Sequence, residues 1–111
     1  MSLNIWLSIF VDVGTEEPYE VNLYDDNITS NLNPMWRQAG VYDALHLDGK
    51  IAQEILPVLR QGLADMQAKP EVYKALNPEN GWGDYEGAID FLQNLIAACQ
   101  KFPKACVFVN Y

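Results

Sequence analysis

The chain opens with a strict alternation of apolar and other residues. Over residues 3–13 every odd position is apolar, and this period of two predicts a half-buried β-strand. Trp6 and Phe10 fall on the opposite face, which we therefore expect to be partly covered as well. Turn-forming residues occupy 14–18 and the alternation resumes at Tyr19, which predicts a β-hairpin with a long loop. The first strand is the most apolar, so we expect it at the centre of the sheet.

Helical periodicity follows the hairpin. The alternation ends at Tyr24, and the short polar residues after it are of the kind that cap helices. Because of Pro34, we expect a helix that either starts near Asn33 or starts earlier and is distorted at Pro34; it ends at Gly40, and a further short helical turn follows over 41–47. A long amphipathic segment follows over 51–66. Pro57 lies inside this segment and predicts either a kink or a late start of the helix.

The C-terminal third holds the clearest helix. Proline at position 70 predicts a short helix over 70–76, and Asp84 is a suitable N-cap for the next one. Pro103 ends this second helix, and residues 105–111 read as a strand. The apolar residues of the helix that follows Asp84 recur at three- and four-residue steps: Ala88, Leu92, Leu95, Ile96, Cys99 and Phe102. The order predicts one α+β domain over 1–111: an N-terminal hairpin, three to four helices on one face, and a C-terminal strand completing a three-stranded sheet.

The charge of the chain narrows the classes of partner. The net charge is −8, and the seven basic residues are scattered singly, so we expect no direct binding to nucleic acid or to an anionic membrane. No segment approaches the roughly 20 apolar residues that span a bilayer. Residues 1–48 hold eight acidic side chains against Arg37 alone: Asp12, Glu16, Glu17, Glu20, Asp25, Asp26, Asp43 and Asp48. This skew indicates either a solvated rim or an acidic face that mimics nucleic-acid charge for a basic partner.

Few residues carry recognisable chemistry. Cys99 and Cys106 fall in an apolar helix stripe and an apolar strand, so both are expected to be buried, reduced thiols in a cytoplasmic protein. His46 is the single histidine, and no cluster of metal-ligating residues surrounds it. The sequence therefore predicts no catalytic residue, no metal and no cofactor.

The segment NPENGWGDYEG, residues 77–87, is the most distinctive of the chain. Its Asn80-Gly81 pair is a strong turn dipeptide, and Gly83 permits a close backbone approach. Trp82 is consequently held on a loop with a dictated backbone. One interpretation is a hydrophobic staple, in which the indole folds onto the following helix. The other is an exposed aromatic anchor beside free helix amides.

Four runs resemble a family of small uncharacterised proteins found in phages, prophages and scattered bacterial genomes. They are NITSNLN (27–33), AGVYDAL (39–45), ILPVLRQGL (55–63) and, most specifically, NPENGWGDYE (77–86). The resemblance covers most of the chain after the first strand. The family has no assigned activity, so it implies a context rather than a mechanism. Relatives often carry a histidine where this chain has Ser30, so a metal or general-base role there could not operate here.

The resemblance also suggests that the two asparagine-containing motifs form one feature. We expect Trp82 to contact the segment 27–36, with an asparagine side chain bonded to a backbone group across the junction. If the polar atoms are saturated internally and Trp82 is covered, the feature is a structural clasp. If these polar atoms face a cleft, the feature is a binding pocket. The expected binding residues are Asn27, Asn31, Trp36, Asn80, Trp82, Tyr85 and Glu86.

Three functional hypotheses follow. The first is a non-catalytic binding or regulatory domain with a phage-related role in host interaction. The second is an acidic protein-binding module that mimics nucleic-acid charge. The third is a small-molecule-binding protein or enzyme with a pocket at the two asparagine-rich helix starts. The expected partner is a protein or a small molecule, and the sequence does not indicate an oligomeric state.

Overall fold

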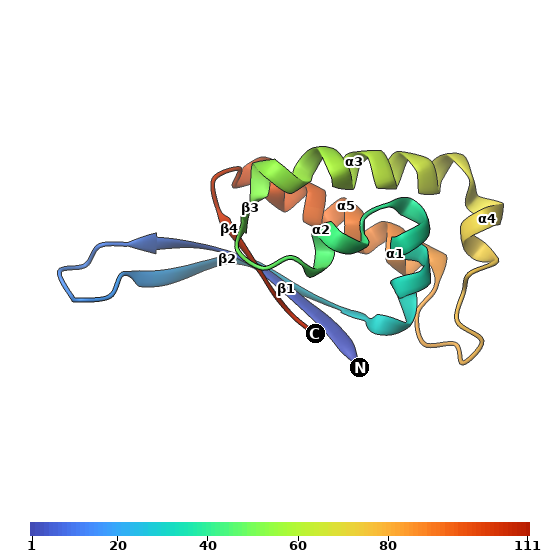
Figure 1. Cartoon of the computed structure of the whole chain (residues 1–111), viewed down its shortest axis with the longest axis horizontal. Coiled ribbons are helices and arrows are strands. Elements are labelled where there is room, and N and C mark those ends of the chain that lie inside the picture. Colours follow the sequence, from blue (N-terminus) through green and yellow to red (C-terminus); the bar gives the residue numbers. More distant parts are fainter.

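The chain folds as an antiparallel sheet with helices packed on one face (Figure 1). The computed structural model describes all residues, 1–111. In chain order the elements are β1 (Ser2–Val11), β2 (Tyr19–Thr29), the 3-10 helix η1 (Ser30–Leu32), α1 (Asn33–Ala39), α2 (Tyr42–His46), β3 (Lys50–Ile51), α3 (Ala52–Ala68), α4 (Pro70–Lys74), α5 (Tyr85–Lys101) and β4 (Cys106–Asn110). The predicted α+β class, hairpin and C-terminal strand are confirmed. The turn expected over 41–47 contains a separate helix, so five α-helices form rather than three or four.

The sheet has the strand order β2-β1-β4-β3. β1 therefore lies inside the sheet, as its apolar character predicts. The fourth strand was not predicted: β3 is only Lys50 and Ile51, which pair with Val107 and Cys106 of β4. Two residues are too few to show an alternation, so no pattern in the sequence marks them.

β2 is longer than predicted. Its pairing with β1 continues without a break from Tyr24 to Thr29, where the sequence pattern indicated that the strand ends at Tyr24. The sequence does not show this continuation because Asp25 and Asn27 are polar. They lie on the face of the sheet that carries no helix, where polar side chains are solvated. Asn27 consequently lies in a strand rather than at a helix start. The cap of η1 is Thr29, whose side chain accepts from the backbone N–H of Asn31 at 3.3 Å.

The inner face of β1 forms the centre of the core. Leu3, Ile5 and Leu7 are 1% exposed or less, and α5 and α3 lie side by side over this face (Figure 1). Each large apolar side chain buried in this way contributes about 1.5–3 kcal/mol. The buried residues of α5 follow the predicted stripe: Ala88, Phe91, Leu92, Leu95, Ile96, Ala98 and Cys99. The helices are therefore fixed to one side of the sheet, and the other face stays open.

The prolines and one glycine set the helix boundaries. Pro34 lies in the first turn of α1, and Gly40 ends this helix in the left-handed conformation with φ +77°. α3 begins at Ala52, before Pro57, so a late start of this helix is wrong. Pro57 is exposed and forgoes only the intrahelical bond to the carbonyl of Gln53, which the helix tolerates near its start.

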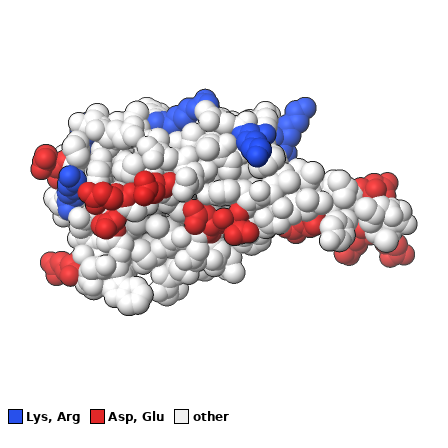
Figure 2. Space-filling model, turned by 180° about the vertical axis from the view of Figure 1, so that it is seen from behind, with Lys and Arg blue, Asp and Glu red and all other residues white.

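The hairpin continues past the helices as a projecting arm, residues 9–20 (Figure 1). The molecule is consequently elongated, with principal extents of 53 × 26 × 18 Å. Every residue of the arm is exposed, including five large apolar or aromatic ones: Ile9, Phe10, Val11, Val13 and Tyr19. Four acidic residues and no basic one accompany them: Asp12, Glu16, Glu17 and Glu20. The acidic groups gather at the tip of the arm (Figure 2).

Candidate functional site

The loop between α4 and α5 holds Trp82 in a defined position. Gly81 and Gly83 adopt positive φ, +75° and +99°, which few other residues tolerate. The Gly81 N–H donates to the carbonyl of Pro78 at 3.3 Å, and the Trp82 N–H donates to Oδ1 of Asn80 at 3.0 Å. The predicted turn chemistry is confirmed.

The base of the loop is tied to α5 and α3. Asp84 is the N-cap, as predicted, and its Oδ1 accepts from the Gly87 N–H at 2.7 Å. Oδ1 of Asn77 accepts from the Tyr85 N–H at 2.8 Å, and the Tyr85 hydroxyl donates to the carbonyl of Met66 at 2.7 Å. Both of these helix amides are therefore bonded internally, and the expectation of free amides beside Trp82 is wrong for them.

The loop contacts the end of β2 and η1, as predicted. Nδ2 of Asn31 donates to the carbonyl of Trp82 at 3.4 Å and to Oδ1 of Asn80 at 3.5 Å, both long bonds. Packing supplies the closer contact. A Cβ added to Gly83 would lie 2.6 Å from Cγ2 of Thr29, so only glycine allows this approach. The two motifs, although far apart in the sequence, form one junction.

A cleft of about 560 Å³ opens at this junction, and we call it the Trp82 cleft. Its volume is in the range typical of small-ligand sites, about 300–1,000 Å³. The lining residues are Met1, Ser2, Asn27, Thr29, Asn31, Asn80 and Trp82, none of them with a charged side chain. Trp82 is 71% exposed. The staple interpretation is therefore wrong, and so is the clasp, since the indole is uncovered and three amides face an open cleft.

The other three expected binding residues lie elsewhere. Trp36 is fully buried and its ring lies 5.8 Å from that of Phe91, because it falls on the inward face of α1. Its indole N–H has no hydrogen-bond partner. Tyr85 uses its hydroxyl within the fold, as described above. Glu86 is exposed on the first turn of α5 but does not line the cleft.

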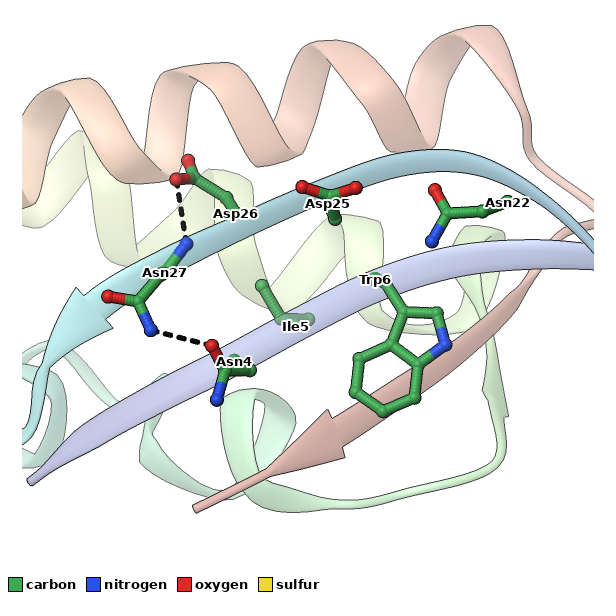
Figure 3. A pocket seen from close by; sticks show the side chains of 7 residues that line it. All are labelled: Asn4, Ile5, Trp6, Asn22, Asp25, Asp26 and Asn27. Carbon is green, nitrogen blue, oxygen red and sulfur yellow. Dashed lines mark hydrogen bonds between the residues drawn. The ribbon is translucent and has the colours of Figure 1, made fainter.

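A second hollow, of about 450 Å³, adjoins the first on the open face of β1 and β2 (Figure 3). We call it the Trp6 hollow, lined by Asn4, Ile5, Trp6, Asn22, Asp25, Asp26 and Asn27. Asn27 lines both hollows, and its Nδ2 donates to Oδ1 of Asn4 at 2.6 Å. The sequence placed Trp6 on this face. It did not reveal the polar neighbours of Trp6, because the continuation of β2 past Tyr24 was missed.

Cross-strand contacts fix the orientation of the Trp6 ring. The Trp6 and Phe108 rings stack with their centroids 5.7 Å apart. The Trp6 indole N–H donates to Oε2 of Glu20 at 3.3 Å, and the same oxygen accepts from the Ser8 hydroxyl at 2.6 Å. Asp26 accepts from the Tyr24 hydroxyl at 3.1 Å, and burial first, then the charge of Asp26, raises the pKa of Tyr24 above its usual range. Tyr24 consequently remains a proton donor to this carboxylate.

The groups with potential reactivity lie away from both hollows. Nδ1 of His46 lies 2.7 Å from the Tyr42 carbonyl, and the two rings stack at 4.0 Å. Burial raises the pKa of the Cys99 thiol to about 11, which suppresses the nucleophilic thiolate. Cys106, expected to be buried, is only half-buried because its position on β4 lies opposite Ser8 on the open side of the sheet. No group of three or more His, Cys, Asp or Glu side chains has the arrangement of a metal site.

Comparison of the chain with protein-family models, with curated proteins and with solved structures found no match. The resemblance to small phage and prophage proteins therefore stays a prediction. None of the helices combines the length and the apolar character needed to cross a bilayer.

The junction predicts different effects for two neighbouring glycines. Alanine at either position adopts an unfavourable positive φ, which costs about 1–2 kcal/mol. A Cβ at Gly81 meets nothing within 4 Å, whereas one at Gly83 overlaps Thr29 and Leu32. We expect Gly83→Ala to lose about 1–3 kcal/mol more of the free energy of unfolding than Gly81→Ala, measured by urea denaturation. Equal losses in the two variants would show that the loop does not pack on η1.

Proposed function

We propose that this chain is a non-catalytic binding module and that its recognition surface is the Trp82 cleft. One observation carries the proposal: a large aromatic side chain is 71% exposed on a loop whose backbone is bonded into place. Exposed, rigid tryptophans are the residues that contribute most to many binding interfaces. Because little loop entropy remains to be lost, binding through Trp82 retains more of its interaction energy.

The polar atoms of the cleft support the same role. Oδ1 of Asn31, Nδ2 of Asn80 and Oδ1 of Asn27 make no hydrogen bond within the protein, although each residue is bonded through its other amide atom. The internal bonds orient the amides, and the remaining atoms, on side chains that line the cleft, are free to act as donors and acceptors. The resemblance to phage and prophage proteins supports an intracellular, phage-related setting for this module, in which a host component is the ligand.

The Trp82→Ala variant tests the proposed surface. Because the indole is mostly exposed, we expect the variant to fold with little loss of stability. A ligand at about 100 times its dissociation constant adds roughly 2.7 kcal/mol and raises the melting temperature by several degrees. Wild type and variant should be screened in parallel by thermal shift with nucleotides, sugars, amino acids and short peptides. At least one class should stabilise the wild type and not the variant.

The control for this screen is Trp36, which is buried and should not respond to ligands. Its indole N–H signal in the ¹⁵N-labelled protein, which is separate from those of Trp6 and Trp82, should keep its position in Trp82→Ala, which shows that the variant is folded. If every ligand that stabilises the wild type also stabilises the variant equally, the Trp82 cleft is not the binding surface.

A second candidate function rests on the arm. A two-stranded ribbon is marginally stable in water by itself, yet this one exposes Val13 at 56% and Tyr19 at 62%. Its inner face continues the apolar face that α5 covers nearer the body. We infer a docking element for a second protein, whose apolar groove would cover these side chains. The four acidic residues of the arm require that the rim of this groove be basic.

The salt dependence of association tests whether the arm is a docking element. Steering by exposed charges fades over about 8 Å at physiological salt, so the on-rate of an arm-dependent partner should fall about tenfold or more as salt rises. The double variant Glu16→Gln/Glu17→Gln should show a shallower dependence. A matched variant that removes two distant exposed acids, Glu71→Gln/Glu79→Gln, should behave as wild type. A partner retained from cell extract whose on-rate ignores both salt and the arm charges contradicts this assignment.

A further inference from the structure

The Trp82 cleft and the Trp6 hollow are two hollows that follow each other along the open face of the sheet and share Asn27, and we call the two together the groove. Asn27 lines both, and its side chain reaches across to Asn4 on the neighbouring strand (Figure 3). The groove follows β1 from Trp6 to Ser2, a length of about 13 Å at the usual rise of a strand. Trp82 stands at the far end. An indole therefore marks each end, and side-chain amides form the floor between them.

The charge of the Trp6 hollow disfavours anionic ligands. None of the lining residues of the groove is Lys or Arg, and the carboxylate on its open face is that of Asp25, because the Asp26 side chain points toward α5 (Figure 3). A phosphate or carboxylate over the Trp6 hollow would meet the Asp25 carboxylate with no Lys or Arg beside it, and the cationic group of the lining, the α-amino group of Met1, lies in the Trp82 cleft. The part of the ligand over the Trp6 hollow should therefore be neutral.

The unpaired polar atoms indicate what kind of neutral ligand fits. The Asn22 amide and the Asp25 carboxylate make no hydrogen bond within the protein, and neither does Nδ2 of Asn4. Amides and carboxylates together offer donors and acceptors side by side, the combination that hydroxyl groups match since each hydroxyl both donates and accepts. A flat indole at each end offers an apolar surface for the CH face of a sugar ring.

A peptide fits this groove less well. A common way for a peptide to bind a sheet is to add a strand at an edge, where main-chain groups are free. The groove lies over the face of β1 and β2: the main-chain groups of β1 are paired with β2 and β4, and those of β2 that lack a strand partner lie along its outer edge rather than on this face. We propose that the groove binds a neutral oligosaccharide, with one sugar ring on Trp6, one on Trp82, the amides of Asn27 and Asn31 on the hydroxyls between, and the amide of Asn22 on a hydroxyl beyond Trp6. This assignment of ligand class rests on the proposed function of the Trp82 cleft.

Titration of the ¹⁵N-labelled protein with neutral oligosaccharides tests the proposal. The probes are glucose oligomers, α- and β-1,4-linked, and N-acetylglucosamine oligomers, each from one to six units. The three indole N–H signals report separately. Those of Trp6 and Trp82 should shift on binding, and that of buried Trp36 should not. The affinity should rise with oligomer length until both indoles are engaged.

Three variants locate the ligand. Trp82→Ala and Asn22→Ala, at opposite ends of the groove, should each weaken binding of the longest oligomer about tenfold, the effect of losing one stacking or hydrogen-bonding contact. Gln93→Ala removes an exposed amide on α5, outside the groove, and should leave the affinity unchanged. Both groove positions are exposed, so all three variants should fold, which circular dichroism checks.

The titrations and the variants distinguish a failure of the groove from a failure of the ligand class and from a failure of the binding surface. If short oligomers bind as tightly as long ones and only Trp82→Ala weakens them, binding along the whole groove is wrong but the Trp82 cleft stands. If no neutral oligosaccharide shifts either signal while a peptide or an anionic probe does so through Trp82, the ligand class is wrong and the binding module stands. If no probe of any class shifts Trp82, both proposals are overturned.

Discussion

The packing of α5 and α3 on one face of β1 is the constraint on which the rest of the structure depends. Leu3, Ile5 and Leu7 are fully buried beneath these helices. Because the helices cover only one side, the opposite face of β1, β2 and β4 remains open and carries the stacked rings of Trp6 and Phe108. Because β1 and β2 extend beyond the helices, the hairpin projects as an arm that no helix covers (Figure 1). Both proposed surfaces are consequences of this one-sided cover.

The asparagine-rich junction supplies the open face with hydrogen-bonding groups for a ligand. Asn27, Asn31 and Asn80 each bond one side-chain atom within the fold and leave the other unbonded on a side chain that lines the Trp82 cleft. Exposed amides of this kind cost little when solvated, whereas they gain when a ligand replaces the water with matching groups. Gly83 brings the loop against Thr29 and so places Trp82 beside these amides.

Much of this fold could be predicted from the sequence because its signals are local. The alternation over residues 3–13 specified β1, and the stripe from Ala88 to Cys99 specified α5. The continuation of β2 was missed because polar residues on an open face have the same composition as a loop. β3 was missed because its two residues are fixed by pairing with β4, which is a tertiary contact. Trp36 was misassigned since only the orientation of α1 decides which side of that helix is buried.

The candidate site was predictable only in part, for the same reason. The resemblance joined two motifs that are distant in the chain, and the contact between Asn31 and the Trp82 backbone confirms that they meet. The Trp6 hollow depends on the register of β1 with β2, which no local pattern reveals. Whether an aromatic residue is a staple or an anchor is likewise a tertiary question, and here the exposure of Trp82 decides it.

The central claim is that Trp82 is held in place before any ligand arrives. The most direct measurement is the backbone ¹⁵N order parameter of Gly81, Trp82 and Gly83, in the wild type and in Asn31→Ala. We expect values near those of the helices, about 0.85, in the wild type, and a fall toward about 0.6 in the variant as the junction loosens. Values below about 0.6 in the wild type would show a mobile loop and contradict a preformed site. Equal, high values in both proteins would show that Asn31 does not hold the loop.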